Sequence, residues 1–315
     1  MNIQVDLIGK RGLKMERSNH KSSQTGKVGR GTTKKFASSL YPNMFIQDFC
    51  QDFSISFSDF NSRENFFKTD STLLRELLEY DDYGLFRYDF SKLLSNIVHD
   101  LIFKGQSYIE TVLYFDDTNE LVGIKFFPLN YIIKFPALRR KLFLAKSYNN
   151  SLIYFYVYKK RIIKFNLNDI SLTKKTFIKL LDKISRLGSP GFDLVNRIPN
   201  FDFERYARYE DFKLLKYTKG VYWNGRKYDN RFVNEPYSLY RLTNYTILRL
   251  TMLKYLLCKI NTSIKNVGDE FNFQGEIECK FDIDEKIAYL KSSYEKFVEK
   301  EINQEQLINI LISKE

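Results

Sequence analysis

Histidine and cysteine, which build many catalytic and metal sites, are scarce in this sequence of 315 residues, with two His and three Cys. His20 lies in a polar N-terminal stretch and His99 in an apolar-periodic segment, so a histidine-based general base or metal site would have to combine very different contexts. Cys50, Cys258 and Cys279 are odd in number and widely separated, which excludes the spacing of a disulfide framework or a zinc knuckle. We expect a reducing compartment, no metal, no cofactor and, on balance, no enzyme.

Glycine, proline and long apolar runs are also few. With 14 Gly, 6 Pro and no internal repeat, fibrous and solenoid architectures are excluded. No segment offers the roughly 20 uncharged apolar residues of a bilayer span, and the N-terminus lacks the apolar core of a signal peptide. A Gly-rich phosphate loop followed by Lys and Ser or Thr is missing too, which argues against nucleotide hydrolysis. We expect a protein of the cytoplasm with no membrane partner.

Apolar and basic residues, by contrast, are abundant. Hydrophobic residues make up 43% and aromatic residues 16% of the chain, enough apolar area to fold one or two globular domains. The 50 Lys and Arg outnumber the 38 Asp and Glu, and the net charge of +12 favours a polyanionic partner such as DNA or RNA. The codons of an AT-rich genome also favour Lys, Asn, Ile, Phe and Tyr, so composition alone does not select a function.

Residues 1–35 carry more than half of the net charge, with nine basic residues against Asp6 and Glu16. Such a segment cannot bury itself, and we predict a disordered basic arm. It is typical either of an arm that binds a polyanion by counterion release or of a solvated tail without a partner. The arm residues that we assign to nucleic-acid binding are Lys10, Arg11, Lys14, Arg17, Lys27, Arg30, Lys34 and Lys35.

The clearest local pattern predicts a helix that leads into a β-hairpin. Ser91 is a suitable N-cap, apolar residues follow at helical spacing, and Gly105 stands where a left-handed C-terminal residue belongs. Turn-forming residues then separate two β-rich runs. The predicted elements are a helix over 91–102, a strand over 107–115, a turn over 116–119 and a strand over 121–127.

The other predicted elements complete an α+β fold, in which an antiparallel sheet packs with helices and the C-terminal half holds one long helix. We predict three regions: the arm 1–35, a wing-like α+β domain 36–190, and a mainly helical region 191–315 with a stem-like helix 236–264. In the wing-like domain, the predicted elements are strands or irregular structure over 36–67, a helix over 72–80, strands over 131–135, 152–158 and 161–165, and a helix that begins at Asp169 or Ser171. A tight turn at Lys159 and Lys160 joins the last two strands. In the helical region, the other predicted elements are a hairpin turn over 223–226, a strand over 276–281, and helices from 284 and over 304–312.

Aromatic and basic residues alternate in two segments, 201–217 and 222–228. This is the composition of a surface on which single-stranded nucleic acid can stack, and equally of a packed core with its charges turned outward. Outside the arm, the residues assigned to nucleic-acid binding are Lys159, Lys160, Arg161, Arg226 and Lys227.

One arrangement of acids suggests a Mg²⁺-dependent nuclease. Glu276, Glu278 and Lys280 alternate on a predicted strand, with Asp269 upstream, and this spacing resembles the core of the restriction-endonuclease-like family, in which carboxylates hold Mg²⁺ and a lysine stabilises the attacking water. Acid-x-Lys triplets also occur elsewhere in this acid- and lysine-rich chain, so coincidence competes with this interpretation.

The helix and hairpin carry a second resemblance. The segments Gly105-Gln106-Ser107-Tyr108-Ile109-Glu110 and Phe127-Pro128-Leu129-Asn130, with the turn between them, resemble the wing region of tailed-phage portal proteins. The resemblance covers about residues 91–170. It implies a homo-oligomeric ring at the capsid vertex that passes DNA, binds the packaging motor and head-tail adaptor proteins, ends up in the virion, and needs no catalytic residues.

These patterns leave three hypotheses, in order. The first is a portal-like structural component of a phage or prophage head. The second is a non-enzymatic nucleic-acid-binding protein that uses the basic arm, and the third is the nuclease.

Overall fold

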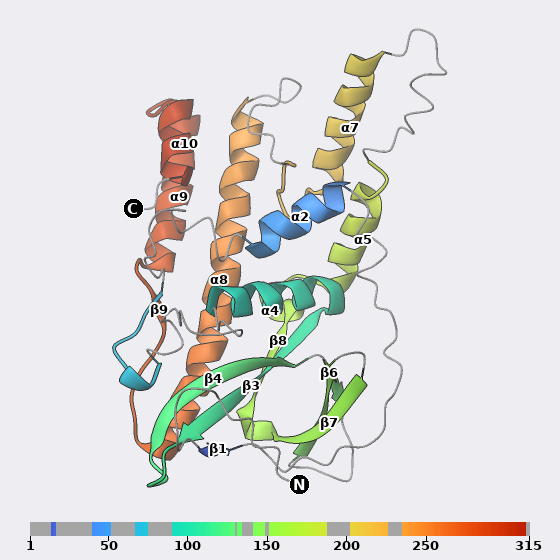
Figure 1. The fold of residues 1–315 in the computed structure, drawn as a ribbon. Helices are drawn as coiled ribbons and strands as arrows, with labels where there is room; N and C mark the ends of the chain where they lie inside the picture. The colour runs from blue at the N-terminus through green and yellow to red at the C-terminus, as the bar shows by residue number, and fades with distance from the viewer. Residues whose placement is uncertain are drawn as a thin grey trace, which may run out of the picture. The chain divides into compact units, whose positions relative to one another are not determined.

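The computed structural model describes residues 14–16, 40–51, 67–74, 90–129, 131–133, 141–148, 151–187, 202–225 and 235–312 (Figure 1). Helices are combined with small antiparallel sheets and with one long helix in the C-terminal half, which confirms the predicted fold class.

The chain divides into two compact units. The first comprises the described residues up to 31, within 53–171 and within 255–280, and the second comprises those within 32–52, 172–254 and 281–315. Both units are discontinuous in sequence, whereas the predicted boundaries after residues 35 and 190 cut the chain into consecutive pieces. The long helix α8 (Glu235–Phe271) contributes residues to both units.

The predicted helix and hairpin form the first unit's best-defined part. Helix α4 (Phe90–Lys104) is followed by Gly105 at φ 77°, by β3 (Gln106–Phe115) and by β4 (Leu121–Leu129). In the turn, Asp116 Oδ1 accepts hydrogen bonds from the backbone N–H groups of Thr118 and Glu120 at 2.9 and 2.8 Å. Ser91 lies inside the first helical turn and is not the N-cap that we predicted, because the helix already begins at Phe90, whose ring packs edge-on against Phe67.

Strand β3 is the centre of a four-stranded antiparallel sheet. One edge of β3 pairs with β4, and the other is shared between β8 (Ile162–Asn166), opposite residues 106–110, and β1 (Lys14–Glu16), opposite residues 113–115. Strand β1 lies within the range predicted as a disordered arm. For its three residues the prediction is wrong, because they form a paired strand, and the rest of the arm lies outside the described residues.

A second antiparallel sheet consists of β5 (Tyr131–Ile133), β6 (Lys141–Tyr148) and β7 (Ser151–Tyr158). The predicted turn at Lys159 and Lys160 is the 3-10 helix η1 (Lys159–Arg161). It does not close a hairpin: β7 pairs with β6 and β8 pairs with β3, so the turn leads from one sheet to the other. The chain then continues through η2 (Leu167–Ile170).

Helices cover the sheet of β3, so that strand is buried along most of its length. Helix α4 packs on β3, β4 and β8 (Figure 1). The second half of α8 contacts β3 as well, through a 3.0 Å hydrogen bond between the Thr111 and Ser263 hydroxyls and a ring contact between Phe115 and Phe271.

Short strands β2 (Phe67–Lys68) and β9 (Glu278–Cys279) pair beside this sheet. The strand predicted over 276–281 is therefore limited to two residues. Of the helix predicted over 72–80, residues 72–74 are helical and the others lie outside the described residues.

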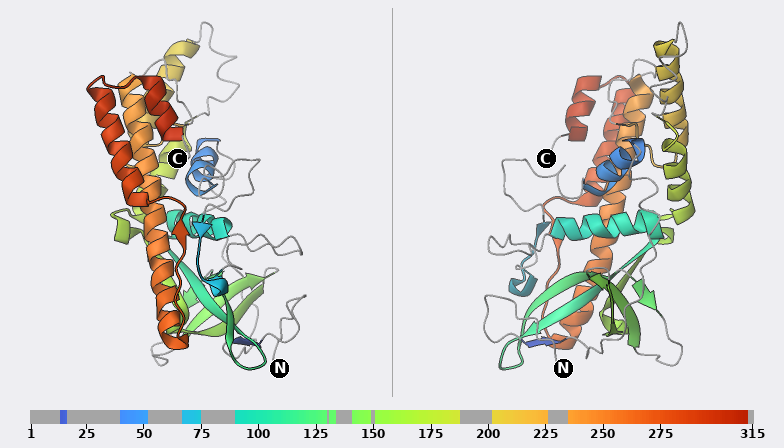
Figure 2. Two further views of the ribbon diagram at one scale, coloured as in Figure 1. Left: turned by 90° about the vertical axis from the view of Figure 1, so that its left-hand side faces the viewer. Right: turned by 45° about the vertical axis from the view of Figure 1, so that its right-hand side comes forward.

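The second unit is helical, with α2 (Leu40–Gln51), α5 (Lys174–Ile184), α7 (Phe203–Tyr217), the first half of α8, α9 (Ile283–Val298) and α10 (Gln304–Ile312) (Figures 1 and 2). Helix α2 falls in a range predicted as strand or irregular. Thr173, and not Asp169 or Ser171, caps α5, because its side chain accepts the N–H of Thr176, while Ser171 is the left-handed C-cap of η2. Helix α8 extends past the predicted end at Ile264 to Phe271.

Aromatic side chains from distant segments form the core of the second unit. The rings of Phe45 and Phe49 from α2 pack on Phe177 of α5, and Phe45 meets Trp223 edge-on at 5.4 Å. The Trp223 indole N–H donates to Asp48 Oδ2 at 2.8 Å. The predicted hairpin turn at 223–226 is therefore wrong for its described part, since residues 218–222 form turns after α7 and Trp223 is a core residue.

Candidate functional site

Lys160 and Arg161 are the predicted nucleic-acid contacts whose side chains the structure describes. Arg161 is 6% exposed, lies 3.2 Å from a carboxylate oxygen of Glu270 on α8, and stacks its guanidinium over the ring of Phe271. Lys160 is exposed and its Nζ lies 2.7 Å from Glu270. Hydrogen bonding from Lys160 and the charge of Arg161 hold the pKa of Glu270 below its usual value.

These contacts correct the assignment of Arg161. Its charge is used inside the first unit, where it ties η1 to α8, and it is too buried to meet a DNA phosphate. The backbones of Lys14 and Lys159 are described, but their side chains are not. The other predicted contacts, which lie outside the described residues, are Lys10, Arg11, Arg17, Lys27, Arg30, Lys34, Lys35, Arg226 and Lys227.

The acids of the nuclease hypothesis are partly brought together around β9. Glu278 lies 3.1 Å from Lys68 on the paired strand β2, and this lysine is the main reason that the pKa of Glu278 lies below its usual value. Glu276 shares a hydrogen bond with Glu278, which raises the pKa of Glu276. Glu278 is thus engaged by Lys68 and by Glu276, so its charge is already matched by a lysine. Among the described residues, no group of three or more His, Cys, Asp or Glu side chains is arranged to hold a metal ion.

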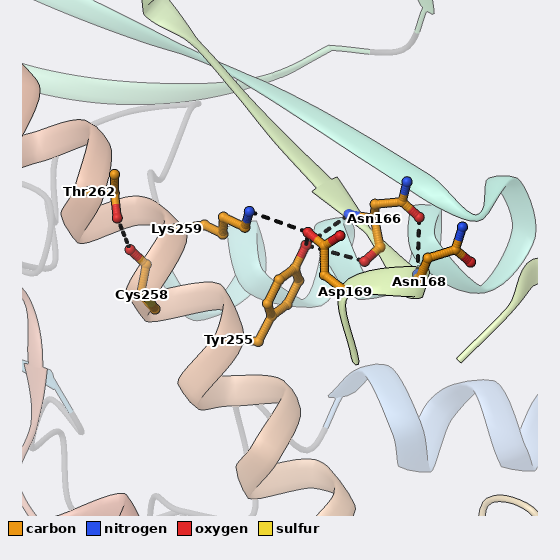
Figure 3. Close-up of polar contacts among 7 residues, drawn as sticks. All are labelled: Asn166, Asn168, Asp169, Tyr255, Cys258, Lys259 and Thr262. Carbon is orange, nitrogen blue, oxygen red and sulfur yellow. Dashed lines mark hydrogen bonds and ion pairs between the residues drawn. The ribbon is translucent and has the colours of Figure 1, made fainter. Parts of the chain in front are cut away.

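A polar cluster in the first unit joins α8 to the end of β8 (Figure 3). We call it the Tyr255 cluster, and it consists of Asn166, Asp169, Tyr255 and Lys259. The Asn166 backbone N–H donates to the Tyr255 hydroxyl at 2.8 Å, and that hydroxyl donates to Asp169 Oδ2, also at 2.8 Å. Lys259 Nζ lies 3.2 Å from the same carboxylate oxygen.

Electrostatics of the Tyr255 cluster follow from this geometry. The hydrogen bond from Tyr255, and then Lys259, keep the pKa of Asp169 below its usual value. Burial, together with the Asp169 charge, raises the pKa of Tyr255 far above that of a free tyrosine. The phenol is therefore protonated at neutral pH and donates to Asp169, so the cluster links the backbone at the end of β8 to α8.

Sequence reasoning missed this cluster, although one signal was present. Tyr255, Lys259 and Ser263 recur every four residues along α8, and thus form a polar stripe on one side of that helix. The partner Asp169 was interpreted only as a helix cap.

Segment 201–217, predicted to be either a stacking surface or a packed core, forms helix α7 and has features of both. Leu214 is buried, as core packing requires, but Tyr209 and Phe212 are 55% and 64% exposed. Arg205, Arg208 and Lys216 are exposed beside them. This aromatic and basic surface belongs to the second unit.

Comparisons with known proteins find a similarity among solved structures. No family model and no curated protein matches the chain. Among solved structures, it is similar to the crystal structure of an HK97-family phage portal protein from Corynebacterium diphtheriae, at 11% sequence identity and a TM-score of 0.40, over 84% of this chain and 99% of that one. Among the described helices, none combines the length and apolar character needed to cross a membrane.

Proposed function

We propose that this chain is a portal-like structural component of a phage or prophage head. Copies of it form a ring that passes DNA through a central channel and docks the packaging motor and head-tail adaptor proteins. It is made in the host cytoplasm and ends up in the virion.

The observation that carries the proposal is the folding of the wing-like segment. The motifs that resemble a portal wing occupy α4, the left-handed Gly105, β3, the Asp116 turn, β4 and β5 in the expected order. A later strand of the same segment, β8, ends at the Tyr255 cluster, which anchors it to the second half of α8. With 37 residues, α8 is about 55 Å long, the length of a stem-like element.

The charge of the chain supports the same function. A ring multiplies a net charge of +12 by its number of copies, which gives a channel potential that guides a polyanion without reading its sequence. The arm residues outside β1 are the ones we propose to contact DNA, together with Lys159, Lys160, Arg226 and Lys227.

The size of the purified chain tests the proposal. Light scattering coupled to size-exclusion chromatography should give a particle of many subunits, and negative-stain images should show a ring with a central hole. A monomer or dimer at every concentration would contradict the ring. If such a monomer still bound DNA through its arm, the second hypothesis would take its place, and Mg²⁺-dependent DNA cleavage lost in Glu278→Ala would support the third.

DNA binding by the arm is tested with two matched triple variants. Changing Lys27, Arg30 and Lys34 to Gln removes three charges from the arm without touching β1. Changing Lys174, Lys175 and Lys179 to Gln removes three from the exposed side of α5. The arm variant should reduce the slope of log binding constant against log salt by about 3, and the α5 variant by much less. Equal slopes in both variants would remove the arm from the proposal.

A further inference from the structure

Helix α7 has one exposed face that is basic with an aromatic centre. We call Arg205, Arg208, Tyr209, Phe212 and Lys216 the basic face. At about 100° per residue these five side chains lie within about 60° of the direction of Phe212. All five are exposed. The neighbouring acid, Glu204, forms an ion pair with Arg208 at the edge of the face.

Helix α9 has an exposed face of the opposite kind. We call Glu285, Ala288, Ser292, Glu295 and Glu299 the acidic face, and they lie within about 60° of the direction of Ala288. The three glutamates and Ala288 are exposed, and Ser292 is half-buried. Lys291 and Lys296 stand at the edges of this face, and Asp284 also lies within it but is paired with Lys254. The opposite side of α9 carries the buried Leu290 and Ser293.

The two faces complement each other in charge, length and bulk. The basic face carries three positive groups and the acidic face three negative ones. At 1.5 Å per residue, Arg205 and Lys216 are about 16 Å apart along α7, and Glu285 and Glu299 about 21 Å apart along α9, so the acidic face is long enough to meet the whole basic face. The large side chains of Tyr209 and Phe212 would lie against the small side chains of Ala288 and Ser292, which leave room for aromatic rings.

Both helices belong to the second unit, where they attach to different sides of α8 (Figures 1 and 2). Helix α9 packs on α8 through Tyr240 and Tyr294, whose ring centroids are 5.7 Å apart, whereas the end of α7 is held by Arg241, which donates to the Leu215 carbonyl at 3.2 Å. Within one copy, the two faces therefore do not cover one another.

We propose that the basic face of α7 in one copy of this chain binds the acidic face of α9 in the next copy. Because two different surfaces meet, the contact is heterologous and repeats from copy to copy, which produces a ring when the rotation closes. The inference rests on the proposed ring and adds the surfaces that build it. Nucleic acid could occupy the basic face alone, but a second copy accounts for both faces.

Charge reversal on each helix tests the contact. One variant combines Arg205→Glu and Lys216→Glu on α7. The other combines Glu295→Lys and Glu299→Lys on α9, which spares Glu285 in the first helical turn, where an acid stabilises the helix. Each variant alone should raise the concentration for half-assembly about 10-fold or more, measured by light scattering. The chain with all four substitutions should assemble like the original, because its faces attract again with reversed signs.

Two controls keep this result interpretable. Lys174→Glu with Lys179→Glu reverses two exposed charges on α5 and should leave the assembly unchanged. The fluorescence of Trp223, the single tryptophan, reports whether the second unit stays folded in every variant.

The outcomes separate this inference from the proposed function. Loss of assembly in both two-substitution variants and recovery in the four-substitution chain supports the contact. Rings that form in all variants overturn the contact but leave the portal-like function standing. An original chain that stays monomeric overturns both. Unchanged assembly with lost DNA binding in the α7 variant assigns the basic face to nucleic acid and also overturns the contact.

Discussion

Different kinds of interaction stabilise the interior of each of the two compact units. In the first, the central part is local: α4, Gly105, β3 and β4 follow one another within 40 residues, and each packs on or pairs with its neighbour in sequence. In the second, the core joins segments that are far apart, as in the bond from Trp223 to Asp48, which spans 175 residues.

Buried arginines show the same difference. Arg161 in the first unit is matched by the partly exposed carboxylate of Glu270, so solvent reaches one side of the pair. Arg241 in the second unit is 1% exposed, and its guanidinium donates to the Trp223 carbonyl at 2.8 Å and to the Thr218 hydroxyl at 2.6 Å. The planar fork of Arg241 thus fixes the turn after α7, which places Trp223 in the core. The helix and hairpin of the first unit therefore depend on backbone geometry, and the core of the second unit depends on a few side chains that bridge distant segments.

The largest expected effect comes from Arg241→Leu. This change leaves buried acceptors at Leu215, Thr218 and Trp223 without their donor, and we expect a loss of about 3 kcal/mol in the free energy of unfolding. Urea unfolding followed by Trp223 fluorescence reports the second unit, and hydrogen exchange of the β3 amides reports the first. The urea concentration at the midpoint of the fluorescence transition should fall, while the protection of the β3 amides from hydrogen exchange changes little.

Arg186→Leu is the matched control. Arg186 is exposed and pairs with Asp182 one helical turn away on α5, so its loss should cost less than about 0.5 kcal/mol. Equal losses in the two variants would mean that Arg241 does not organise the second unit.

The same contrast explains what the sequence could predict. The helix over 91–102, Gly105 and the two strands are specified by periodicity and turn chemistry over short distances, and the structure confirms them with shifts of a few residues at their ends. Helix α10 is predicted with its full range, 304–312. Its start is marked locally, because Asn303 and Gln306 bond to each other's backbone N–H groups.

The missed features depend on long-range contacts. Phe45 and Phe49 are spaced like a helix, but one such pair is too short a pattern to distinguish helix from strand, and what fixes α2 is packing on Phe177 and Trp223. The Asn224-Gly225 pair is typical of a hairpin. Here Gly225, at φ 73°, serves close packing, since a Cβ at that position would lie 2.6 Å from Leu214 Cδ2. Pairing of β8 with β3, and not with β7, likewise has no local signal.

An intermediate effect is expected for Gly105→Ala, which tests the backbone geometry of the first unit. At φ 77° a side chain is strained, and we expect a loss of about 1–2 kcal/mol, seen as faster exchange of the β3 amides. Gly220→Ala in the second unit is the control, because a Cβ there meets no atom within 4 Å, and it should change stability by less than about 0.5 kcal/mol. If Gly105→Ala changed neither the stability nor the exchange of the β3 amides, the helix and hairpin would not depend on this turn.

The smallest expected effect comes from Tyr255→Phe, which removes a hydroxyl that links α8 to Asn166 and Asp169 in the first unit. The loss of its bonds to the Asn166 backbone N–H and to Asp169 should cost about 1 kcal/mol at neutral pH. Tyr206→Phe is the matched change in the second unit. Its hydroxyl bonds Glu210 at 2.8 Å within the same helix, and its removal should cost about 0.3 kcal/mol.

The pH dependence separates the two tyrosine variants further. The folded pKa of Asp169 lies below its ordinary value of 3.8, so the bond stabilises the fold above that value, and the stabilisation disappears as the pH falls through the folded pKa. Tyr255 is neutral throughout this range, because burial raises its pKa. The stability gap between the original chain and Tyr255→Phe should therefore be constant from pH 7 to about pH 5 and shrink below about pH 4. A gap that stays constant through pH 3 would mean that the Tyr255 hydroxyl acts through its bond with the Asn166 backbone and not through the Asp169 carboxylate.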